Sequence, residues 1–354
     1  MIRVDIDDVN SFRLMLNANG NEYIDAILDS RVALFVNNTR EMFASCKLSC
    51  VSTDESESFS VRIPRKLLLN FASAGYFTIS CSESEVTVAF FEQDEFGVSL
   101  TCKVTFARQQ IWTNDYKNKL ELVDNTDEDA PIDLSSCGDI VKIGNLLKEI
   151  VNINRGVISI SAGYAFKLYQ QVDTDANFSL SANSLLSLLK ISKEIFDYRN
   201  YVGVKKGCLL LLATKTRGQD NSDYALLAEE RASFKADIDV SYLINFLSKV
   251  QLEQNVINFN LLEQGAIIDT GVRRYFIPVM VKNLEKHPSI MECVVNMPKQ
   301  ILLILNKLVN DGVMYLSNKK TFVQLDVGDY VIIFVVSGAD RYDDYLRELS
   351  PLFE

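Results

Sequence analysis

The sequence predicts an α+β protein of three similar domains, each made of two strand–helix–strand units with the helices on one face of antiparallel sheets. Three observations lead to this prediction. Short runs rich in Val, Ile, Phe and Tyr alternate with polar residues, as in half-buried strands. Amphipathic segments of about three turns stand between these runs. The same order of segments returns with a period of about 55 to 60 residues, which indicates an internal repeat.

Six amphipathic segments are predicted to be helices. In the last of them, Ile301, Ile304 and Leu308 follow the i, i+3, i+7 spacing of a buried stripe. The predicted helices span residues 10–18, 64–74, 140–152, 184–195, 240–250 and 299–310. Capping residues or first-turn prolines support the starts of several helices, namely Asp139, Asn183, Asp239, Pro64 and Pro298.

Strands are predicted before and after each helix. The first two units have them at residues 1–6, 22–30, 31–38 and 41–50, then at 59–63, 76–82, 85–92 and 97–106. The third unit has them at 131–136, 156–163 and 164–172, so it is one strand short. The fourth has them at 178–181, 201–207, 208–216 and 223–230. The last two have them at 233–238, 255–263, 265–271 and 273–283, then at 292–297, 312–317, 320–328 and 329–338.

The six units pair into three domains, because one unit alone cannot bury both its helix stripe and its sheet face. The predicted domains are residues 1–118, 119–232 and 233–354, the last with a C-terminal tail at 338–354. The stretch 114–136 contains a run of acids and is predicted to be the linker between the first two domains.

Composition limits the function classes. The chain has 354 residues, a net charge of −11 and 48% hydrophobic residues, so it is a folded acidic protein. Its N-terminus carries no secretory signal, and no apolar run reaches the length of a membrane span. The seven cysteines are predicted to be reduced core residues of an intracellular protein. A protein that binds DNA over its whole surface should be basic, so any contact with DNA must be local.

The predicted helices depart from this acidic balance. They contain ten basic residues and two acids, Glu149 and Glu194, a net +8 that leaves −19 for the remainder of the chain. The basic residues are Arg13, Arg65, Lys66, Lys142, Lys148, Lys190, Lys193, Lys249, Lys299 and Lys307. One interpretation is that these are ordinary solvated helix faces. The other is that all six helices face one polyanion and neutralise phosphates without reading bases.

Three domains of two units each, with basic helices on one face, resemble the DNA sliding clamps, and the bacterial beta clamp most of all. The resemblance implies that the helices line a hole and the sheets form the outer wall. It implies a head-to-tail homodimer ring that encircles double-stranded DNA and tethers a DNA polymerase for processive synthesis. Polymerase, and a clamp loader if one is needed, are expected to bind through short peptide motifs. The resemblance implies no catalysis and no cofactor.

Two stretches are similar to segments that form the partner-peptide pocket of beta clamps, ISAGYAFKLY at 160–169 and YFIPVMVKN at 275–283. The pocket residues that this implies, with the end of the last strand added, are Ser161, Gly163, Phe166, Pro278, Val279, Lys282, Val335 and Val336. The tail sequence LSPLF resembles a clamp-binding peptide. It either occupies such a pocket or belongs to a terminal helix that packs on its own domain.

An enzyme is not expected, because the chain has one histidine, His287, and no nucleophile, phosphate-loop or metal-ligand motif. Cys46 and Cys50 lack the second pair of ligands that a zinc site needs. The alternative to a sliding clamp is a structural or adaptor protein with clamp-like repeats that does not encircle DNA. The predicted location is the cytoplasm, or the host cytoplasm if the chain is viral.

Overall fold

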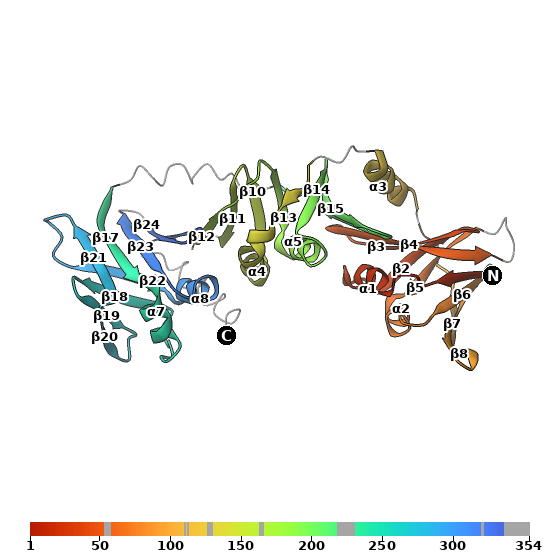
Figure 1. The fold of residues 1–354 in the computed structure, drawn as a ribbon, viewed down its shortest axis with the longest axis horizontal. Helices are drawn as coiled ribbons and strands as arrows, with labels where there is room; N and C mark the ends of the chain where they lie inside the picture. Colours follow the sequence, from red (N-terminus) through yellow and green to blue (C-terminus); the bar gives the residue numbers. More distant parts are fainter. Residues whose placement is uncertain are drawn as a thin grey trace. The chain divides into compact units, whose positions relative to one another are not determined.

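The structure is a computed structural model that describes residues 1–52, 58–109, 111, 113–125, 130–162, 166–217, 231–319 and 322–335. It confirms the predicted α+β class, with large antiparallel sheets and few helices (Figure 1). Its contacts define two compact units. Unit 1 contains Met1–Ile132 and Ser187–Lys215, and unit 2 contains Asp133–Leu186 and Thr216–Glu354. The division into three domains stays a prediction.

The predicted strand–helix–strand unit occurs six times in order. The first three copies contain β1 (Ile2–Asp5), α1 (Val9–Asn17), β2 (Tyr23–Leu28), β3 (Val32–Asn38) and β4 (Met42–Ser52), then β5 (Phe59–Pro64), α2 (Arg65–Asn70), β6 (Tyr76–Cys81), β7 (Glu85–Asp94) and β8 (Gly97–Ala107), then β9 (Ile132–Asp133), η1 (Ser135–Cys137), α4 (Gly138–Leu147), β10 (Ile150–Asn154), β11 (Val157–Ala162) and β12 (Phe166–Gln171). The helix α3 (Asn114–Asn125) lies between the second and third copies.

The last three copies follow the same order. They contain β13 (Asn177–Ser181), α5 (Ala182–Leu189), β14 (Glu194–Tyr198), β15 (Tyr201–Lys206) and β16 (Leu209–Thr214), then β17 (Ala232–Asp239), α7 (Val240–Leu247), β18 (Val256–Leu262), β19 (Gly265–Asp269), β20 (Arg274–Pro278) and β21 (Val281–Lys286), then β22 (Cys293–Pro298), α8 (Lys299–Leu308), β23 (Val313–Lys319), β24 (Phe322–Val327) and β25 (Tyr330–Val335). The predicted strand at 223–230 and the tail at 338–354 lie outside the described residues.

The long strand β4 organises unit 1. One of its sides pairs with β3, while the other pairs with β16 over Met42–Cys46 and with β1 over Cys50–Ser52. The last strand of the first copy therefore pairs with the last strand of the fourth copy, across a large sequence separation. From β1 the sheet continues through β6, β7 and β8, and from β16 it continues through β15 and β14.

Unit 2 repeats this arrangement. Its larger sheet runs β13-β10-β11-β12-β25-β24-β23-β17-β21, and a smaller one runs β20-β19-β18-β22. The pairing of β12 with β25 runs from Phe166–Phe334 to Gln170–Tyr330. It again joins the last strands of two different copies, here the third and the sixth. Two antiparallel ladders of the same kind thus connect what the sequence predicts as successive domains.

The two faces of β3 are covered by different helices. Phe12 of α1 contacts Phe35 of β3, with ring centroids 5.2 Å apart. The next residue, Val36, belongs to a separate core that includes Tyr116 and Val123 of α3. Successive strand residues point to opposite faces. Helices α1 and α3 therefore lie on opposite sides of this sheet, as Figure 1 shows.

The helix α3 corrects the prediction of a linker at 114–136. Its signal is present in the sequence, because Tyr116, Leu120 and Val123 recur at i, i+4, i+7 and form a stripe against Phe43 of β4. The surrounding acidic residues gave this stretch the composition of a solvated linker. The helix is stabilised because this stripe is buried against strands that are far away in the sequence.

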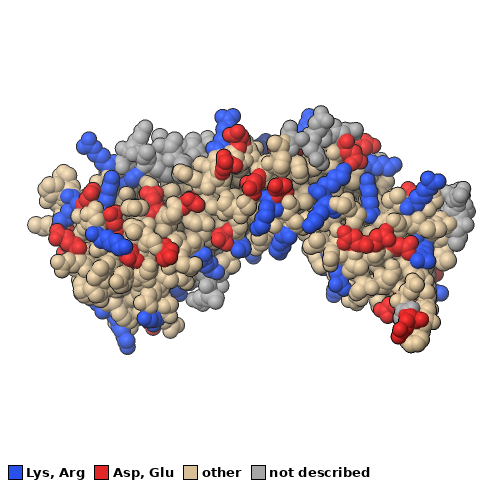
Figure 2. All heavy atoms as spheres, viewed as in Figure 1, with Lys and Arg blue, Asp and Glu red and all other residues tan. Residues whose placement is uncertain are grey.

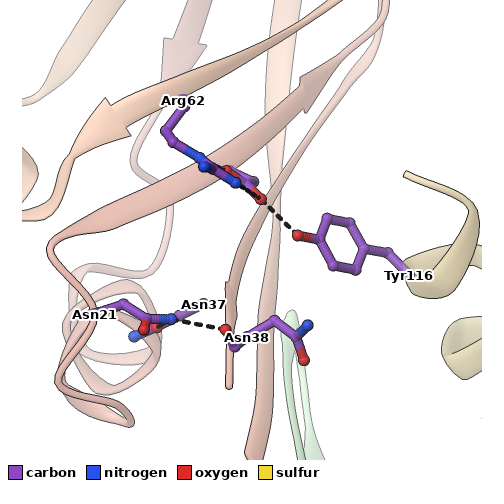
Figure 3. A network of polar contacts seen from close by, with 6 residues as sticks. Asn21, Asn37, Asn38, Arg62 and Tyr116 are labelled. Atoms are coloured by element: carbon purple, nitrogen blue, oxygen red, sulfur yellow. Dashed lines mark hydrogen bonds and ion pairs between the residues drawn. The ribbon is translucent and has the colours of Figure 1, made fainter. Parts of the chain in front are cut away.

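A buried charge holds α3 in place. The Asp25 carboxylate of β2 accepts two hydrogen bonds from the Arg62 guanidinium, at 2.7 and 3.2 Å, and one from the Tyr116 hydroxyl at 2.5 Å (Figure 3). The Asp25 side chain is only 8% exposed. A carboxylate this deeply buried is costly unless its oxygens are paired, and here both are paired.

The helices end earlier than predicted. Lys148 has a φ of +57°, and the Glu149 N–H donates to the Gly144 carbonyl, the bond that closes a Schellman motif. The chain then enters β10, which supplies the strand that the third copy was predicted to lack. Likewise α5 ends at Leu189, and Glu194 begins β14.

The predicted helix starts are partly right. Asp239 is the N-cap of α7, and its carboxylate accepts from the Ser241 N–H. Pro64 and Pro298 are the N-cap residues of α2 and α8. Asp139 and Asn183 lie inside α4 and α5, and the Ser181 hydroxyl accepts from the Ser184 N–H at the start of α5.

One predicted strand, 273–283, is two strands. Val279 adopts a φ of +63°, which breaks the extended chain between β20 and β21. As a result β20 pairs with β19 in the small sheet, whereas β21 pairs with β17 in the large one. Residues 275–281 form a continuous apolar run, and Pro278 directly before the break is the sequence signal that the prediction of one strand overlooked.

We predict that Tyr116→Phe lowers the free energy of unfolding by about 1.5 to 3 kcal/mol, because it removes one hydrogen bond to a buried carboxylate and leaves the ring packing intact. Chemical denaturation measures this change. Tyr242→Phe, at a tyrosine that is 41% exposed, is the control and should leave the stability unchanged. Equal stabilities of the two variants would show that Asp25 does not hold α3.

Candidate nucleic-acid interface

The repeat helices lie next to one another within each unit. In unit 1, α1 packs against α2, and the Arg13 guanidinium donates to the Ser73 hydroxyl beyond α2 at 2.9 Å. In unit 2, α8 packs against both α4 and α7. Each set of helices therefore forms one continuous surface.

The basic bias of these helices is present within their observed bounds. They contain six basic residues and one acid, Asp139. The basic residues are Arg13, Arg65, Lys66, Lys142, Lys299 and Lys307. By contrast, α3 on the opposite sheet face has three acids and two lysines. The face drawn in Figure 2 carries both signs of charge in every part, so the bias belongs to the repeat helices rather than to the surface at large.

Four predicted DNA-facing lysines lie just beyond helix C-termini and not on the helices. They are Lys148 after α4, Lys190 and Lys193 after α5, and Lys249 after α7. All four are exposed. A positive charge at this position interacts favourably with the helix dipole, which accounts for the four lysines without any ligand. The helix charge is therefore six basic residues against one acid, smaller than the sequence predicts.

The basic residues on the helices differ in how strongly the protein itself holds them. The half-buried Arg65 guanidinium donates to the carbonyls of Leu16 and Asn19 at 3.3 and 3.2 Å, and so covers the end of α1. Lys142 pairs with Asp139 at 2.9 Å, with both side chains more than half exposed. Such an exposed pair contributes little, so Lys142 can exchange this partner for a phosphate.

Three of the residues predicted for the peptide pocket lie close together at the β12–β25 ladder. Phe166 is buried and pairs in register with Phe334, which precedes Val335. Ser161 lies on β11, the next strand, and is half-buried. Gly163 and Val336, also predicted for this pocket, lie outside the described residues.

The other predicted pocket residues lie on different strands. Pro278 ends β20 in the small sheet, and Val279 follows it with its side chain 59% exposed. Lys282 on β21 pairs with Asp239 at 2.9 Å. Four strand steps separate β21 from β25, roughly 19 Å at about 4.8 Å per step. The structure therefore brings Ser161 and Phe166 together with the end of β25, and places Lys282 far along the same sheet.

Lys282 has a structural role in the third predicted domain. Its ammonium group lies beside Asp239, the N-cap of α7, and this contact together with the Ser241 hydrogen bonds lowers the pKa of the Asp239 carboxyl. The ion pair holds β21 to the start of α7.

The described residues show little that resembles a catalytic or metal centre. They contain no cluster of three or more His, Cys, Asp or Glu side chains that could hold a metal ion. His287 is exposed and shares a hydrogen bond with the Ser289 hydroxyl. A cavity of about 550 Å³ in unit 2, beside Leu262, Met291 and Cys293, is lined by none of the predicted pocket residues. No helix in the described ranges is long and apolar enough to cross a membrane.

Two strands that sequence reasoning did not single out lie at the ends of their sheets. β8 ends the sheet of unit 1, and β20 ends the small sheet of unit 2. Both carry exposed apolar side chains, with Val98 at 54%, Leu100 at 55% and Phe276 at 58%. An edge strand presents a row of N–H and C=O groups to any strand that approaches it. These edges are therefore candidate surfaces for pairing with another chain.

Comparison with known proteins identifies the fold. No family model matches the sequence, and no curated protein matches it. Among solved structures, a putative DNA polymerase III beta subunit from Eubacterium rectale ATCC 33656 matches with a TM-score of 0.68 and 9% identity, over 96% of this chain and 100% of that chain. The DNA polymerase III subunit beta of Borrelia burgdorferi, in complex with a natural product, matches with a TM-score of 0.63 and 12% identity, over 96% and 99%.

A third match is the Helicobacter pylori beta clamp bound to a DNA ligase peptide, with a TM-score of 0.64 and 10% identity, over 96% of this chain and 99% of that chain. All three share the whole architecture with this chain but little of its sequence. The chain has the fold of the bacterial beta sliding clamps, in a strongly divergent sequence, as the repeat pattern predicted.

Proposed function

We propose that this protein is a DNA sliding clamp that encircles duplex DNA and tethers a DNA polymerase, and that it has no catalytic activity of its own. The observation that carries the proposal is the charge on the repeat helices. Six basic residues against one acid, in a chain of net charge −11, give the repeat helices of each unit a positive balance. The acidic remainder repels DNA elsewhere.

The chemistry of this surface favours sliding. Lysine and arginine contacts to phosphates carry no sequence information, so every position along the duplex is equivalent. Lys66, Lys142 and Lys307 are exposed on long flexible side chains that can follow the phosphates. Lys148, Lys190, Lys193 and Lys249, next to the helix ends, extend the same positive surface in this proposal.

Ring closure follows from the internal pairing pattern. In both ladders of the chain, the last strand of the first unit in one predicted domain pairs with the last strand of the second unit in the next domain. In the first unit of the third predicted domain the last strand, β21, already pairs with β17, which leaves β20 at the end of the small sheet as the open edge. We propose that β20 of one copy pairs with β8 of the other, and β8 with β20. Two copies arranged head to tail satisfy both edges, which makes a closed dimer.

Partner binding is the third part of the proposal. The Helicobacter pylori clamp is bound to a DNA ligase peptide, and we place an equivalent peptide site at the β12–β25 junction, beside Ser161, Phe166 and Val335. Gly163 and Val336 belong to the same proposed site, and Pro278, Val279 and Lys282 form a separate surface. A polymerase held there stays at high effective concentration over its template.

We predict that replacing Lys66, Lys142, Lys190 and Lys299 by Gln together weakens binding to duplex DNA and flattens its salt dependence. Each lost phosphate contact lowers the slope of log K against log salt by about 0.9. Fluorescence anisotropy at several salt concentrations measures both effects.

The control for this variant changes the net charge by the same amount. It replaces four exposed lysines outside the repeat helices by Gln, namely Lys47, Lys117, Lys205 and Lys235. If the protein is a sliding clamp, the control variant should bind duplex DNA nearly as tightly as the wild type. Equal losses in the two variants would show that only the overall charge matters, and would favour the adaptor alternative.

We predict that the wild-type protein is a dimer of twice the 40.0 kDa chain mass and that Phe276→Asp, or Leu100→Asp, converts it to monomers. A charge in an apolar strand–strand interface is desolvated without a partner. Light scattering measures the mass, and negative-stain class averages of the wild type should show a ring with a central hole. Tyr315→Asp, at a tyrosine that is 55% exposed on the doubly paired strand β23, should remain dimeric. Compact wild-type monomers without a hole would contradict encirclement.

A further inference from the structure

Two cysteines from distant parts of the chain meet where β16 begins to pair with β4. The Sγ atoms of Cys46 and Cys208 are 3.5 Å apart, although 162 residues separate the two positions in the sequence. Cys46 is on β4 directly opposite Leu209, the first residue of β16. The Lys47 N–H donates to the Cys208 carbonyl at 3.0 Å. Both the backbone and the side chains therefore fix this close approach.

The position of Cys208 leaves its side chain room to move. Lys206 pairs with Leu209, so Gly207 and Cys208 form a two-residue hairpin turn between β15 and β16. Gly207 has the positive φ, +57°, that such turns require. Cys208 is half-buried at the surface, whereas Cys46 is fully buried. A modest rotation of the two side chains can bring the sulfurs to the bonding distance of about 2.05 Å.

We propose that Cys46 and Cys208 form a reversible disulfide, which makes this junction a site of oxidative modification by a peroxide. The Cys208 thiolate attacks one peroxide oxygen, which breaks the O–O bond, gives a sulfenic acid and releases hydroxide. The Cys46 sulfur then attacks the sulfenic sulfur, and the Cys46 proton leaves with the sulfenic hydroxyl as water. The two sulfurs lose two electrons in total, and the peroxide gains them.

The chemistry of the two thiols sets this order of events. Burial raises the pKa of the Cys46 thiol, so it is a poor first nucleophile. Cys46 reacts only with a sulfenic acid formed beside it, which makes it the resolving cysteine. Cys50 on the same strand is not an alternative partner, because a four-residue offset in a strand separates two residues by roughly 13 Å. Burial also raises the pKa of Cys50 to about 11, and its Sγ–H donates to the Asp29 carbonyl.

The Cys46–Cys208 disulfide would stabilise the β4–β16 junction of the folded chain. The β4–β16 ladder joins two predicted domains, and a cross-link at its start closes a very long loop of the unfolded chain. The oxidised protein should therefore unfold at a temperature higher by at least about 3 °C. The inference does not depend on DNA binding, so its failure and that of the proposed clamp function are distinguishable.

The test treats the full-length protein with hydrogen peroxide and then alkylates the remaining thiols in denaturant. The reduced protein should take up seven alkyl groups, one for each of its cysteines, and the oxidised protein should take up two fewer. Peptide mapping should find one cross-linked pair containing residues 46 and 208, which dithiothreitol releases. Thermal unfolding of the two forms gives the change in Tm.

The variant Cys208→Ser should lose both the linked peptide and the gain in Tm. Cys293→Ser, at a buried cysteine in the other unit, should keep both. Full alkylation after peroxide, a different cysteine pair, or oxidation of Cys208 to the sulfinic acid without a link would each overturn the proposal. A link without any change in Tm would overturn the claim that it locks the junction.

Discussion

The pairing of last strands between different copies of the repeat is the constraint on which the remaining structure depends. Each strand–helix–strand unit ends on a strand with one open edge, and an open edge invites pairing with any other strand. The chain closes two such edges internally, at β4–β16 and β12–β25. β8 and β20 remain as open edges at the ends of their sheets, and in the proposed ring they pair between copies.

The helices satisfy a second constraint, which is local. Each helix buries one apolar stripe on its sheet, as Phe12, Met15 and Leu16 of α1 do, and leaves the other side to solvent. Folding places little constraint on the charge of that exposed side, because exposed charged residues contribute little to stability. Six basic residues against one acid on α1, α2, α4 and α8, no charged residue on α5 and α7, and an excess of acids on α3 therefore need a cause outside folding. The DNA binding proposed above is such a cause.

The sequence predicted the elements that depend on local periodicity and missed those that depend on distant contacts. All six repeat helices and the α+β class were found from periodicities of 3.6 and 2. The ends of α4 and α5 were missed, because Lys148 adopts a left-handed conformation that is more usual for glycine. The break at Val279 and the helix α3 were also missed. Pro278 and the apolar stripe of α3 were weak local signals, and the sheets that these segments meet fix their conformation. For the candidate site, the basic residues of the repeat helices were predicted from the sequence. That β8 and β20 lie at the edges of their sheets could not be predicted, because it depends on which strands pair.

The internal β4–β16 junction and the proposed β8–β20 junction between copies differ in the contacts that hold them together. The β4–β16 junction is covered on its outer face by α3, which the Asp25 carboxylate holds through the Tyr116 hydroxyl, and a pair of thiols stands at its start. The proposed β8–β20 junction between copies has neither device among the described residues and exposes only modest apolar side chains such as Val98 and Phe276. A ring that must open to admit DNA needs at least one junction weaker than the rest. In the proposed ring, this distribution of contacts favours opening between the two chains rather than within one of them.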